Sequence, residues 1–439
     1  MLGWLLFTVA LSTSPLFSSA EPLSLELEAP LSELFTQDRA ADYAVTGALT
    51  VMSDGRPVRI DGVRVSLRGH TSRRENECEF PKLKIAFPAG SHDAAPVFSG
   101  LKSIKLNTHC GEAADGRLTP RYGRLPNEHS PLREAFVYRL LAALEVPTLQ
   151  VRGAKVTYRD SGKEPLVRQA LIVEDTDAAV RWVGGTREIG ETEFSNARDQ
   201  LTTGDAVRLA FAEALIGNFD WCLKMVPDDR YRCDARHSLW NIIAAGRGDG
   251  HATALIYDFD VAGLVAGRHP WFNTTFTHGF APQASEAEIE VIAQLQRART
   301  LFPRAELDAA RKQFIARKPQ AFEALKAAEL DAEGAAIARR YLEAFFAQIE
   351  RDELFYRRVV RAPQTEVHAA ANGQPACGSR SVIPVGTPVS APLQTSGDRV
   401  QVMLLDSLWH WTGAGGCEAI RCGPVWIDAA AIGTDFPPR

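Results

Sequence analysis

The sequence lacks the features that mark membrane-spanning and nucleic-acid-binding proteins. No window of the 439 residues contains the roughly 20 consecutive apolar residues that a membrane-spanning helix needs. Basic residues are not in excess, because 49 Lys and Arg stand against 54 Asp and Glu, for a formal net charge of -5. Binding to nucleic acid requires concentrated positive charge. We therefore expect neither a transmembrane segment nor a nucleic-acid partner.

Several catalytic and metal-binding signatures are missing as well. The sequence has no CxxC pair and no Cys/His spacing typical of zinc sites. It has no GxSxG elbow from which a Ser/His/Asp site could be built. Neither a Walker motif nor a Gly-rich GxGxxG loop is present, so the phosphates of a nucleotide would have to be bound by lysines and by residues 68–74.

The first 20 residues have the layout of a cleavable secretory signal. A short apolar run over residues 4–11 is followed by polar and small residues, and cleavage is expected after Ala20. All seven cysteines lie beyond that point, and an oxidising compartment would let local pairs such as Cys222 with Cys233 close. An odd count leaves one thiol without a partner in its own chain. We expect an exported protein, either periplasmic or extracellular.

Strands alternate with helices over the first two thirds of the chain. The expected strands alternate apolar and polar residues, and they are residues 44–52, 63–68, 83–87, 103–107, 151–158 and 169–173. One helix opens at Ser130-Pro131, with the proline in its tolerated first turn. Another covers residues 205–216 and stops at Gly217.

A second pair of strands is expected further along, at residues 241–245 and 254–257. The turn Gly248-Asp249-Gly250 between them is a strong hairpin signal. Residues 284–360 are rich in Ala, Glu, Arg and Leu with helical periodicity, and they predict a helical subdomain. The Pro-containing residues 361–365 indicate a linker.

Three polar residues that are distant in sequence are the candidates for a catalytic site. Asp220 follows a helix end in the segment GNFDW, Asn241 begins a strand, and Asp258 leaves the returning strand. Kinase-like active sites use this order of residues. Mg²⁺ prefers hard oxygen ligands, which Asn and Asp side chains on adjacent strand ends supply, and a loop carboxylate can orient the proton of an attacking hydroxyl. We expect the three side chains to meet at the mouth of one cleft.

Asp260 extends this group. It lies two positions after Asp258, so on extended backbone both carboxylates face one side while Phe259 faces the core.

These segments resemble the spore-coat-protein-H (CotH) family of kinase-like phosphotransferases. The resemblance covers about residues 60–270 and is most specific over residues 217–264. The specific segments are GNFDW, WNII and LIYDFDVAGLV. Looser matches upstream are RGHTSR (68–73), FPKLKI (80–85), LKSIKLNTHC (101–110), LRE (132–134) and LIVED (171–175).

The resemblance implies an α+β fold with an atypical, protein-kinase-like two-lobed domain. Family members with this fold transfer a phosphoryl group from ATP to protein hydroxyls, with Mg²⁺ as cofactor and Mn²⁺ as an alternative. Matched by position, Asp220 would be the catalytic residue. Asn241 and Asp258 would bind the metal ion, and Asp260 would support the metal site.

Four further residues follow from the same match. Lys84 would contact the ATP phosphates, and Lys105 on a neighbouring strand is the alternative. Arg68 would also contact the phosphates, and Glu174 at a strand end would border the adenine pocket.

The remaining sequence changes character. Residues 366–435 are poor in Lys and rich in Gly, Val and Trp, in short strand-sized runs. They resemble a small all-β bacterial SH3-like (SH3b) barrel, which implies docking to a peptide or a cell-wall ligand. The expected organisation is a signal segment (1–20), a kinase-like domain (21–283), a helical subdomain that completes its second lobe (284–360) and the SH3-like domain.

Two other functions stay open at this point. One is a catalytically inactive, pseudokinase-like envelope scaffold that keeps the fold as a binding surface. The other is a nucleotidyl transferase that moves AMP from ATP onto a protein.

Overall fold

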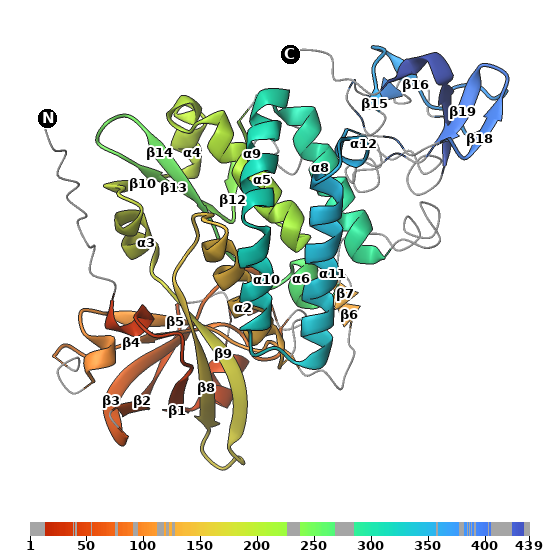
Figure 1. Ribbon diagram of the computed structural model, residues 1–439. Helices are drawn as coiled ribbons and strands as arrows, with labels where there is room; N and C mark the ends of the chain where they lie inside the picture. Colours follow the sequence, from red (N-terminus) through yellow and green to blue (C-terminus); the bar gives the residue numbers. More distant parts are fainter. Residues whose placement is uncertain are drawn as a thin grey trace, which may run out of the picture.

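Seven strands at the start of the chain form a closed barrel (Figure 1). The structure, a computed structural model, describes residues 14–37, 39, 42–53, 55–74, 78–90, 95–111, 118–119, 123–124, 128–225, 238–267, 285–356, 359–376, 382–383, 385, 387, 389, 392–402, 404 and 424–433. Around the barrel the strands are β1 (Leu23–Glu28), β2 (Ala44–Ser53), β3 (Arg56–Leu67), β4 (Leu83–Ala86), β5 (Ser103–Asn107), β9 (Leu166–Val173) and β8 (Val151–Arg159).

All neighbouring strands of the barrel are antiparallel except β1 and β8, which pair in parallel and close it. Alternate residues fill the interior, because side chains change face at every step along a strand. In β1, Leu23, Leu25 and Leu27 are buried and join the barrel core. The short helix α1 (Leu31–Thr36) follows β1.

The strands expected from the alternating pattern are present. Two differences stand out: β3 begins at Arg56 rather than at residue 63, and β1 had not been expected at all. The alternation Leu-Ser-Leu-Glu-Leu-Glu in β1 is the regular signal of a half-buried strand and could have located it.

A second core lies beyond the barrel and is mainly helical (Figure 1). Its long helices are α2 (Ser130–Ala143), α5 (Thr203–Ile216), α8 (Glu286–Leu301), α9 (Arg304–Ala316), α10 (Lys318–Lys326) and α11 (Ala332–Ile349). Their contacts include a cluster of aromatic rings, in which the centroids of Phe211 and Phe314 are 5.7 Å apart and those of Phe314 and Phe345 are 5.5 Å apart. The helices expected from residue 284 onward are therefore observed, and they share one core with α2 and α5.

A small sheet packs into the same core and carries part of the candidate site. It consists of β10 (Arg187–Ile189), β13 (Ile242–Gly246) and β14 (Ala252–Ile256). Strands β13 and β14 form the expected hairpin, in the register Ile242 opposite Ile256. The shorter elements nearby are α3 (Thr176–Trp182), α4 (Glu191–Phe194), α6 (Gly263–Ala266), the pair β11 (Cys222–Leu223) and β12 (Leu239–Trp240), and the pair β6 (Leu118–Thr119) and β7 (Gly123–Arg124).

The C-terminal strands form small sheets around a core of their own. They follow the short helix α12 (Asp352–Phe355) and are β15 (Val359–Val360), β16 (Thr365–Glu366), β17 (Val382–Ile383), β18 (Gln394–Ser396), β19 (Arg399–Val402), β20 (Val425–Asp428) and β21 (Ile432–Gly433). Strand β15 pairs with β21. This C-terminal unit therefore begins before residues 361–365, where a linker had been expected.

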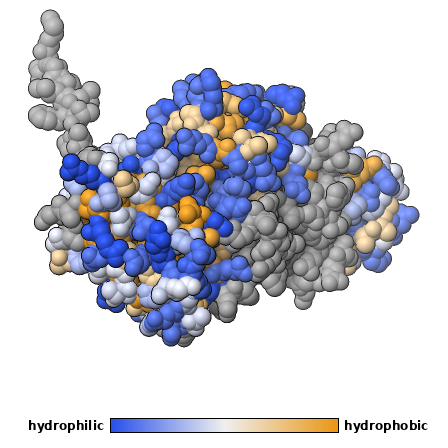
Figure 2. Space-filling view, turned by 90° about the horizontal axis from the view of Figure 1, so that it is seen from below, coloured by the Kyte–Doolittle hydropathy of each residue, from blue (hydrophilic) through white to orange (hydrophobic). Residues whose placement is uncertain are grey.

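The expected fold class is confirmed. The chain has a mixed α+β fold, as the sequence predicted. Within the ranges given above, no helix combines the length and the apolar character needed to cross a membrane. On the face shown in Figure 2, hydrophilic residues predominate and hydrophobic ones form scattered patches.

A disulfide bond joins Cys78 and Cys110, whose Cα atoms are 4.8 Å apart. It connects the segment that leads into β4 with the segment that leaves β5. Cys222 is also disulfide-bonded. Its expected partner, Cys233, lies outside the described residues.

Replacing Cys78 and Cys110 together by serine should destabilise the protein. The bond closes a loop with a sequence separation of 32, and loop-closure entropy predicts a loss of about 3–4 kcal/mol in the free energy of unfolding. Urea denaturation of the wild type and the double variant, both without reductant, measures this difference. A loss below about 1 kcal/mol would show that other contacts already restrain the two segments.

Candidate functional site

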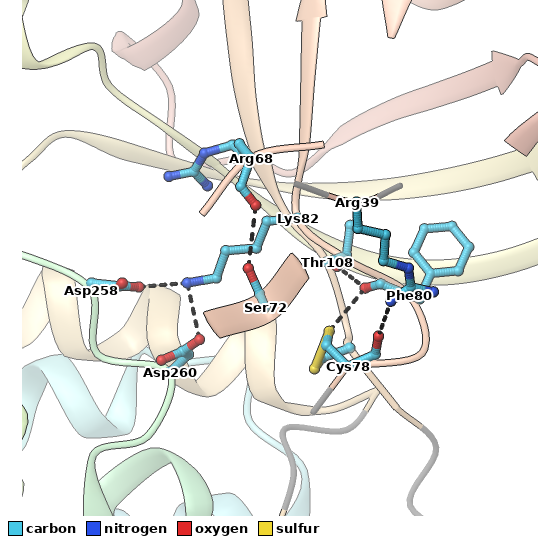
Figure 3. The surroundings of a disulfide bond; sticks show 10 residues. Arg39, Arg68, Ser72, Cys78, Phe80, Lys82, Thr108, Asp258 and Asp260 are labelled. Carbon is cyan, nitrogen blue, oxygen red and sulfur yellow. Dashed lines mark hydrogen bonds and ion pairs between the residues drawn. A yellow bond between two sulfur atoms is a disulfide. The ribbon is translucent and has the colours of Figure 1, made fainter. Parts of the chain in front are cut away.

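One buried ammonium group holds together two carboxylates from a distant part of the chain (Figure 3). The Nζ atom of Lys82 lies 2.5 Å from Oδ1 of Asp258 and 2.9 Å from Oδ2 of Asp260. The Lys82 side chain is 8% exposed, whereas those of Asp258 and Asp260 keep 34% and 24% of their exposure. The lysine is therefore enclosed, while the carboxylates can still be reached from solvent.

Local structure aims the two carboxylates at the lysine. Strand β14 ends at Ile256, and the N–H of Tyr257 still donates to the carbonyl of Asn241 at 3.2 Å. Phe259 is fully buried, with its ring 4.8 Å from that of Tyr138. Phe259 lies in the core while Asp258 and Asp260 contact the same ammonium group, although the backbone at Asp258 is left-handed and not extended as the sequence had suggested.

Backbone strain coincides with two of the expected metal ligands. Asp258 has a φ of 65° and Asn241 a φ of 52°, in the left-handed region that non-glycine residues seldom adopt. The tyrosine hydroxyl of Tyr138 accepts the N–H of Asp258 at 3.1 Å and supports this conformation. Such strain persists only where the surroundings enforce it, and it concentrates at functional sites.

The loop that carries Asp220 is fastened to the start of this hairpin. The Asn241 amide donates from Nδ2 to the carbonyl of Asp220 at 2.6 Å. The indole of Trp240 donates to the carboxylate of Asp220 at 2.9 Å. Asn241 in turn adjoins Asp258 through the backbone bond to Tyr257. The structure therefore brings together Asp220, Asn241 and Asp258, which lie on separate segments of the chain.

Asn218 fixes the Asp220 loop through two hydrogen bonds. Its side-chain oxygen accepts the N–H of Asp220 at 2.9 Å, and its backbone carbonyl accepts Nε2 of Gln294 at 2.5 Å. Asn218 is fully buried, directly after the left-handed Gly217 that ends α5. Sequence reasoning had missed Asn218 and Gln294, although Asn218 belongs to the segment GNFDW.

Two glycines make the Asp220 and Asp258 loops meet. The N–H of Gly263 donates to the carbonyl of Gly217 at 3.1 Å. Both glycines lie against the buried pair in which Tyr341 of α11 donates to Glu290 of α8 at 2.5 Å. A Cβ at either glycine would collide with the Tyr341 ring or hydroxyl. Only glycine permits this close approach.

A network of buried polar groups lies behind Lys82. The Asn107 amide donates to both carboxylate oxygens of Glu134, at 3.0 and 3.1 Å, and Arg68 donates to the Asn107 oxygen. Burial raises the pKa of Glu134 to about 7, although the Lys82 charge acts to lower it. Burial alone would lower the pKa of Lys82, but the charges of Asp258 and Asp260 outweigh it and keep the lysine protonated.

Of the lysines near the site, Lys82 contacts the two aspartates, whereas Lys84 and Lys105, which were expected to bind nucleotide phosphates, lie elsewhere on β4 and β5. The ammonium that reaches Asp258 and Asp260 is that of Lys82, a residue sequence reasoning had passed over in favour of its neighbour Lys84. Lys84 is exposed and stands opposite Lys105 in the β4–β5 register. Lys105 forms an ion pair of 3.2 Å with Asp175. Lys82 lies just before β4, where strand alternation does not indicate which way a side chain points.

Glu174 is buried at the end of β9. Its carboxylate accepts the N–H of Gln150 at 2.9 Å and Nε2 of Gln150 at 3.2 Å. Burial raises its pKa to about 7.

The expected metal site uses one amide and one carboxylate, with a second carboxylate in support. Among the described residues there is no cluster of three or more His, Cys, Asp or Glu side chains suited to a metal ion. Comparison with known proteins adds no assignment: no family model matches the chain, and no curated protein is similar to it in sequence.

The buried carboxyl of Glu174 should make stability depend on pH. The pKa of a glutamate in the unfolded chain is about 4.3. Because the folded-state pKa of Glu174 is about 7, its carboxyl stabilises the fold fully below the unfolded pKa, and this stabilisation is lost as the pH rises through about 7. Between pH 5 and pH 8, the wild type should lose about 2–3 kcal/mol of unfolding free energy relative to Glu174→Gln. Denaturant titrations at both pH values measure the change. The exposed Glu329→Gln is the control, and an equal change in both variants would contradict the assignment.

Removing the ammonium of Lys82 should expose the repulsion between its partners. Lys82→Met is expected to lose about 2–3 kcal/mol of unfolding free energy at pH 7, because Asp258 and Asp260 lose their counter-charge. The loss should shrink toward pH 4, where the carboxylates become protonated. Lys84→Met is the matched control, since Lys84 is exposed. Equal thermal and chemical stability of the two variants would refute the central role of Lys82.

Proposed function

We propose that the protein is an atypical kinase-like phosphotransferase that moves a phosphoryl group from ATP to a protein hydroxyl with Mg²⁺. The observation that carries this proposal is the convergence of one enclosed ammonium with a group of oxygen ligands. Lys82 meets Asp258 and Asp260, while hydrogen bonds join Asn241 to Asp220 and to the residue before Asp258. Phosphoryl transfer depends mainly on positioning and on stabilising negative charge, and this arrangement suits both needs.

The donor set fits a hard divalent cation. Because Nδ2 of Asn241 donates to the Asp220 carbonyl, its Oδ1 is the atom that can face a metal ion. The Asp258 and Asp260 carboxylates add oxygens that remain partly exposed. Asn241 and Asp258 would hold Mg²⁺ or Mn²⁺ with Asp260 in support, and the bound ion would neutralise charge on the nucleotide phosphates.

Asp220 would orient the acceptor hydroxyl and take its proton. The Trp240 indole and the Asn218 amide oxygen hold the residue in place through its carboxylate and its backbone N–H. Lys82 would contact the phosphates, with Glu134 of α2 behind it. Protein kinases likewise place a glutamate from a helix beside the lysine that contacts the phosphates. In this proposal the barrel and the helical part are the two lobes.

The outer parts of the chain have supporting roles in the proposal. Lys105, Lys84 and Arg68 would line the approach to the nucleotide, and Glu174 would border the adenine pocket. The C-terminal strands from Val359 to Gly433 would be an SH3-like docking module for a peptide or cell-wall ligand.

We place this activity outside the cytoplasm, in the periplasm or outside the cell. The Cys78–Cys110 disulfide supports this location, because such bonds persist in oxidising compartments. Residues 1–13 of the expected signal segment lie outside the described residues. Of the remainder, Leu16 packs into the barrel core, and its carbonyl accepts a hydrogen bond from Arg152 at 3.1 Å.

A non-catalytic binding protein is the competing function, and one observation favours it. The Lys82 ammonium already spans both aspartates, and the Trp240 indole already engages the Asp220 carboxylate. A protein that uses these contacts only to hold its fold together would have no need of nucleotide.

Calorimetry with Mg²⁺ and ATP, and without Mg²⁺, tests the proposal. The wild type should bind ATP only with the metal ion, and Asp258→Asn should weaken that binding at least about 100-fold by removing a charged metal ligand. Asp220→Asn should bind normally but slow transfer by about 10²–10⁴-fold, the range for loss of a general base. The exposed residue Asp249 provides the matched control Asp249→Asn. Absence of ATP binding by the wild type would refute the proposal.

Mass spectrometry of incubated protein targets separates the remaining alternatives. Phosphoryl adducts support the proposed reaction, whereas the heavier AMP adducts would assign the chain as a nucleotidyl transferase. Binding of ATP without any adduct would favour the pseudokinase-like scaffold.

A further inference from the structure

The last turn of α5 carries a buried carboxyl that has no part in the proposed reaction so far. Glu213 is fully buried, and neither of its carboxyl oxygens has a hydrogen-bond partner among the described residues. No other Asp or Glu in the described part of the chain has both oxygens buried in this way. The remaining buried side chains of α5 are all apolar. A buried polar group without a partner opposes folding, which indicates a role other than stability.

Glu213 adjoins Asn218 at two points. The backbone N–H of Asn218 donates to the Glu213 carbonyl at 2.9 Å. The Asn218 side chain also lies close enough to the Glu213 carboxyl to act on its pKa, although Nδ2 is buried outside the geometry of a regular hydrogen bond. The residue that fixes the Asp220 loop is thus itself bordered by Glu213, through its backbone and through its amide.

The orientation of the Asn218 amide links the two residues. Oδ1 of Asn218 accepts the N–H of Asp220 at 2.9 Å, so Nδ2 is directed away from Asp220. In the reverse orientation the NH₂ group would meet the Asp220 N–H, and two donors would face each other. The observed orientation leaves Nδ2 in need of an acceptor within the buried core, and the adjacent carboxyl of Glu213 is the group that can supply it.

The charge state of Glu213 suits this part. Burial raises the pKa of Glu213 well above its ordinary value, and the Asp220 charge adds to the effect, although Asn218 and Arg297 act to lower it. A neutral carboxyl still has an acceptor oxygen for Nδ2, and it places no second negative charge beside Asp220. Glutamine has nearly the same shape and also carries an acceptor oxygen, so it is the conservative replacement at this position.

We propose that Glu213 is a positioning residue that acts on Asp220 through the Asn218 amide. The inference rests on the proposed function, in which Asp220 orients the acceptor hydroxyl. Trp240 and Asn241 hold the carboxylate and the carbonyl of Asp220, whereas its N–H is held by Asn218. Without an acceptor at position 213, the Asn218 amide would turn or withdraw and release that N–H. A displaced Asp220 slows transfer while leaving the nucleotide-binding residues in place.

Hydrogen exchange of the full chain, without ATP or Mg²⁺, tests the position of the loop. Peptides that cover residues 217–223 report on the Asp220 N–H when exchange is followed by mass spectrometry. Glu213→Leu should accelerate exchange in these peptides at least about tenfold, because the loop opens more readily. Glu213→Gln should exchange like the wild type, and the exposed Glu323→Leu on α10 is the control. Wild-type exchange in Glu213→Leu, or equal acceleration in both Glu213 variants, would overturn the proposal.

Melting temperatures separate positioning from a purely structural role. Glu213→Leu removes the cost of burying a carboxyl, and this gain offsets the loss of an acceptor for Nδ2. The melting temperature of Glu213→Leu should therefore stay near that of the wild type while exchange in the loop accelerates. A melting temperature that falls alike in Glu213→Leu and Glu213→Gln would assign Glu213 to the fold alone and contradict the proposal.

Kinetics connect the loop with the proposed reaction. With a protein target that mass spectrometry has shown to be modified, Glu213→Leu should lower kcat about 10–100-fold at an unchanged KM for ATP, and Glu213→Gln should keep the wild-type kcat. An unchanged kcat in Glu213→Leu would refute the link between Glu213 and transfer. If the wild type does not bind ATP, the proposed function fails, whereas the exchange experiment still decides whether Glu213 positions Asp220.

Discussion

The ion triad of Lys82 with Asp258 and Asp260 is the contact on which the arrangement of the candidate site depends. It joins residues separated by 176 positions, one at the edge of the barrel and two at the end of the β13–β14 hairpin. Two partly buried carboxylates that contact one ammonium would repel each other without a cation between them. The lysine therefore acts both as the electrostatic partner of the pair and as one of the links between the barrel and the β13–β14 hairpin.

Several residues around the triad adopt conformations or surroundings that are unfavourable for folding. Asn241 and Asp258 both adopt left-handed backbone, and Glu134 carries a carboxyl whose burial disfavours its charged form. Each of these features opposes folding when taken alone. Hydrogen bonds hold them in place: Tyr138 accepts the N–H of Asp258, Asn107 donates to Glu134, and Asn241 donates to the Asp220 carbonyl. The packing of Phe259 adds to these bonds.

Sequence reasoning succeeded where a periodic or local signal existed. Alternation located most barrel strands, and the Gly217 stop located the end of α5, so Asp220, Asn241 and Asp258 could be placed on adjoining loops. It did not find the contact of Lys82 with the two aspartates, because the direction of that side chain depends on how the chain enters β4, which the Phe80–Cys110 bridge and a disulfide determine. Barrel closure by the parallel β1–β8 pair is a long-range contact without a local signature. The roles of the site residues remain predictions.

The meeting of Gly217 and Gly263 over Tyr341 and Glu290 has a mechanical consequence. The loop that bears Asp220 and the turn after Asp260 rest on the same two side chains, contributed by α11 and α8. The packing of this one buried pair therefore fixes the position of the Asp220 loop and that of the turn after Asp260 together.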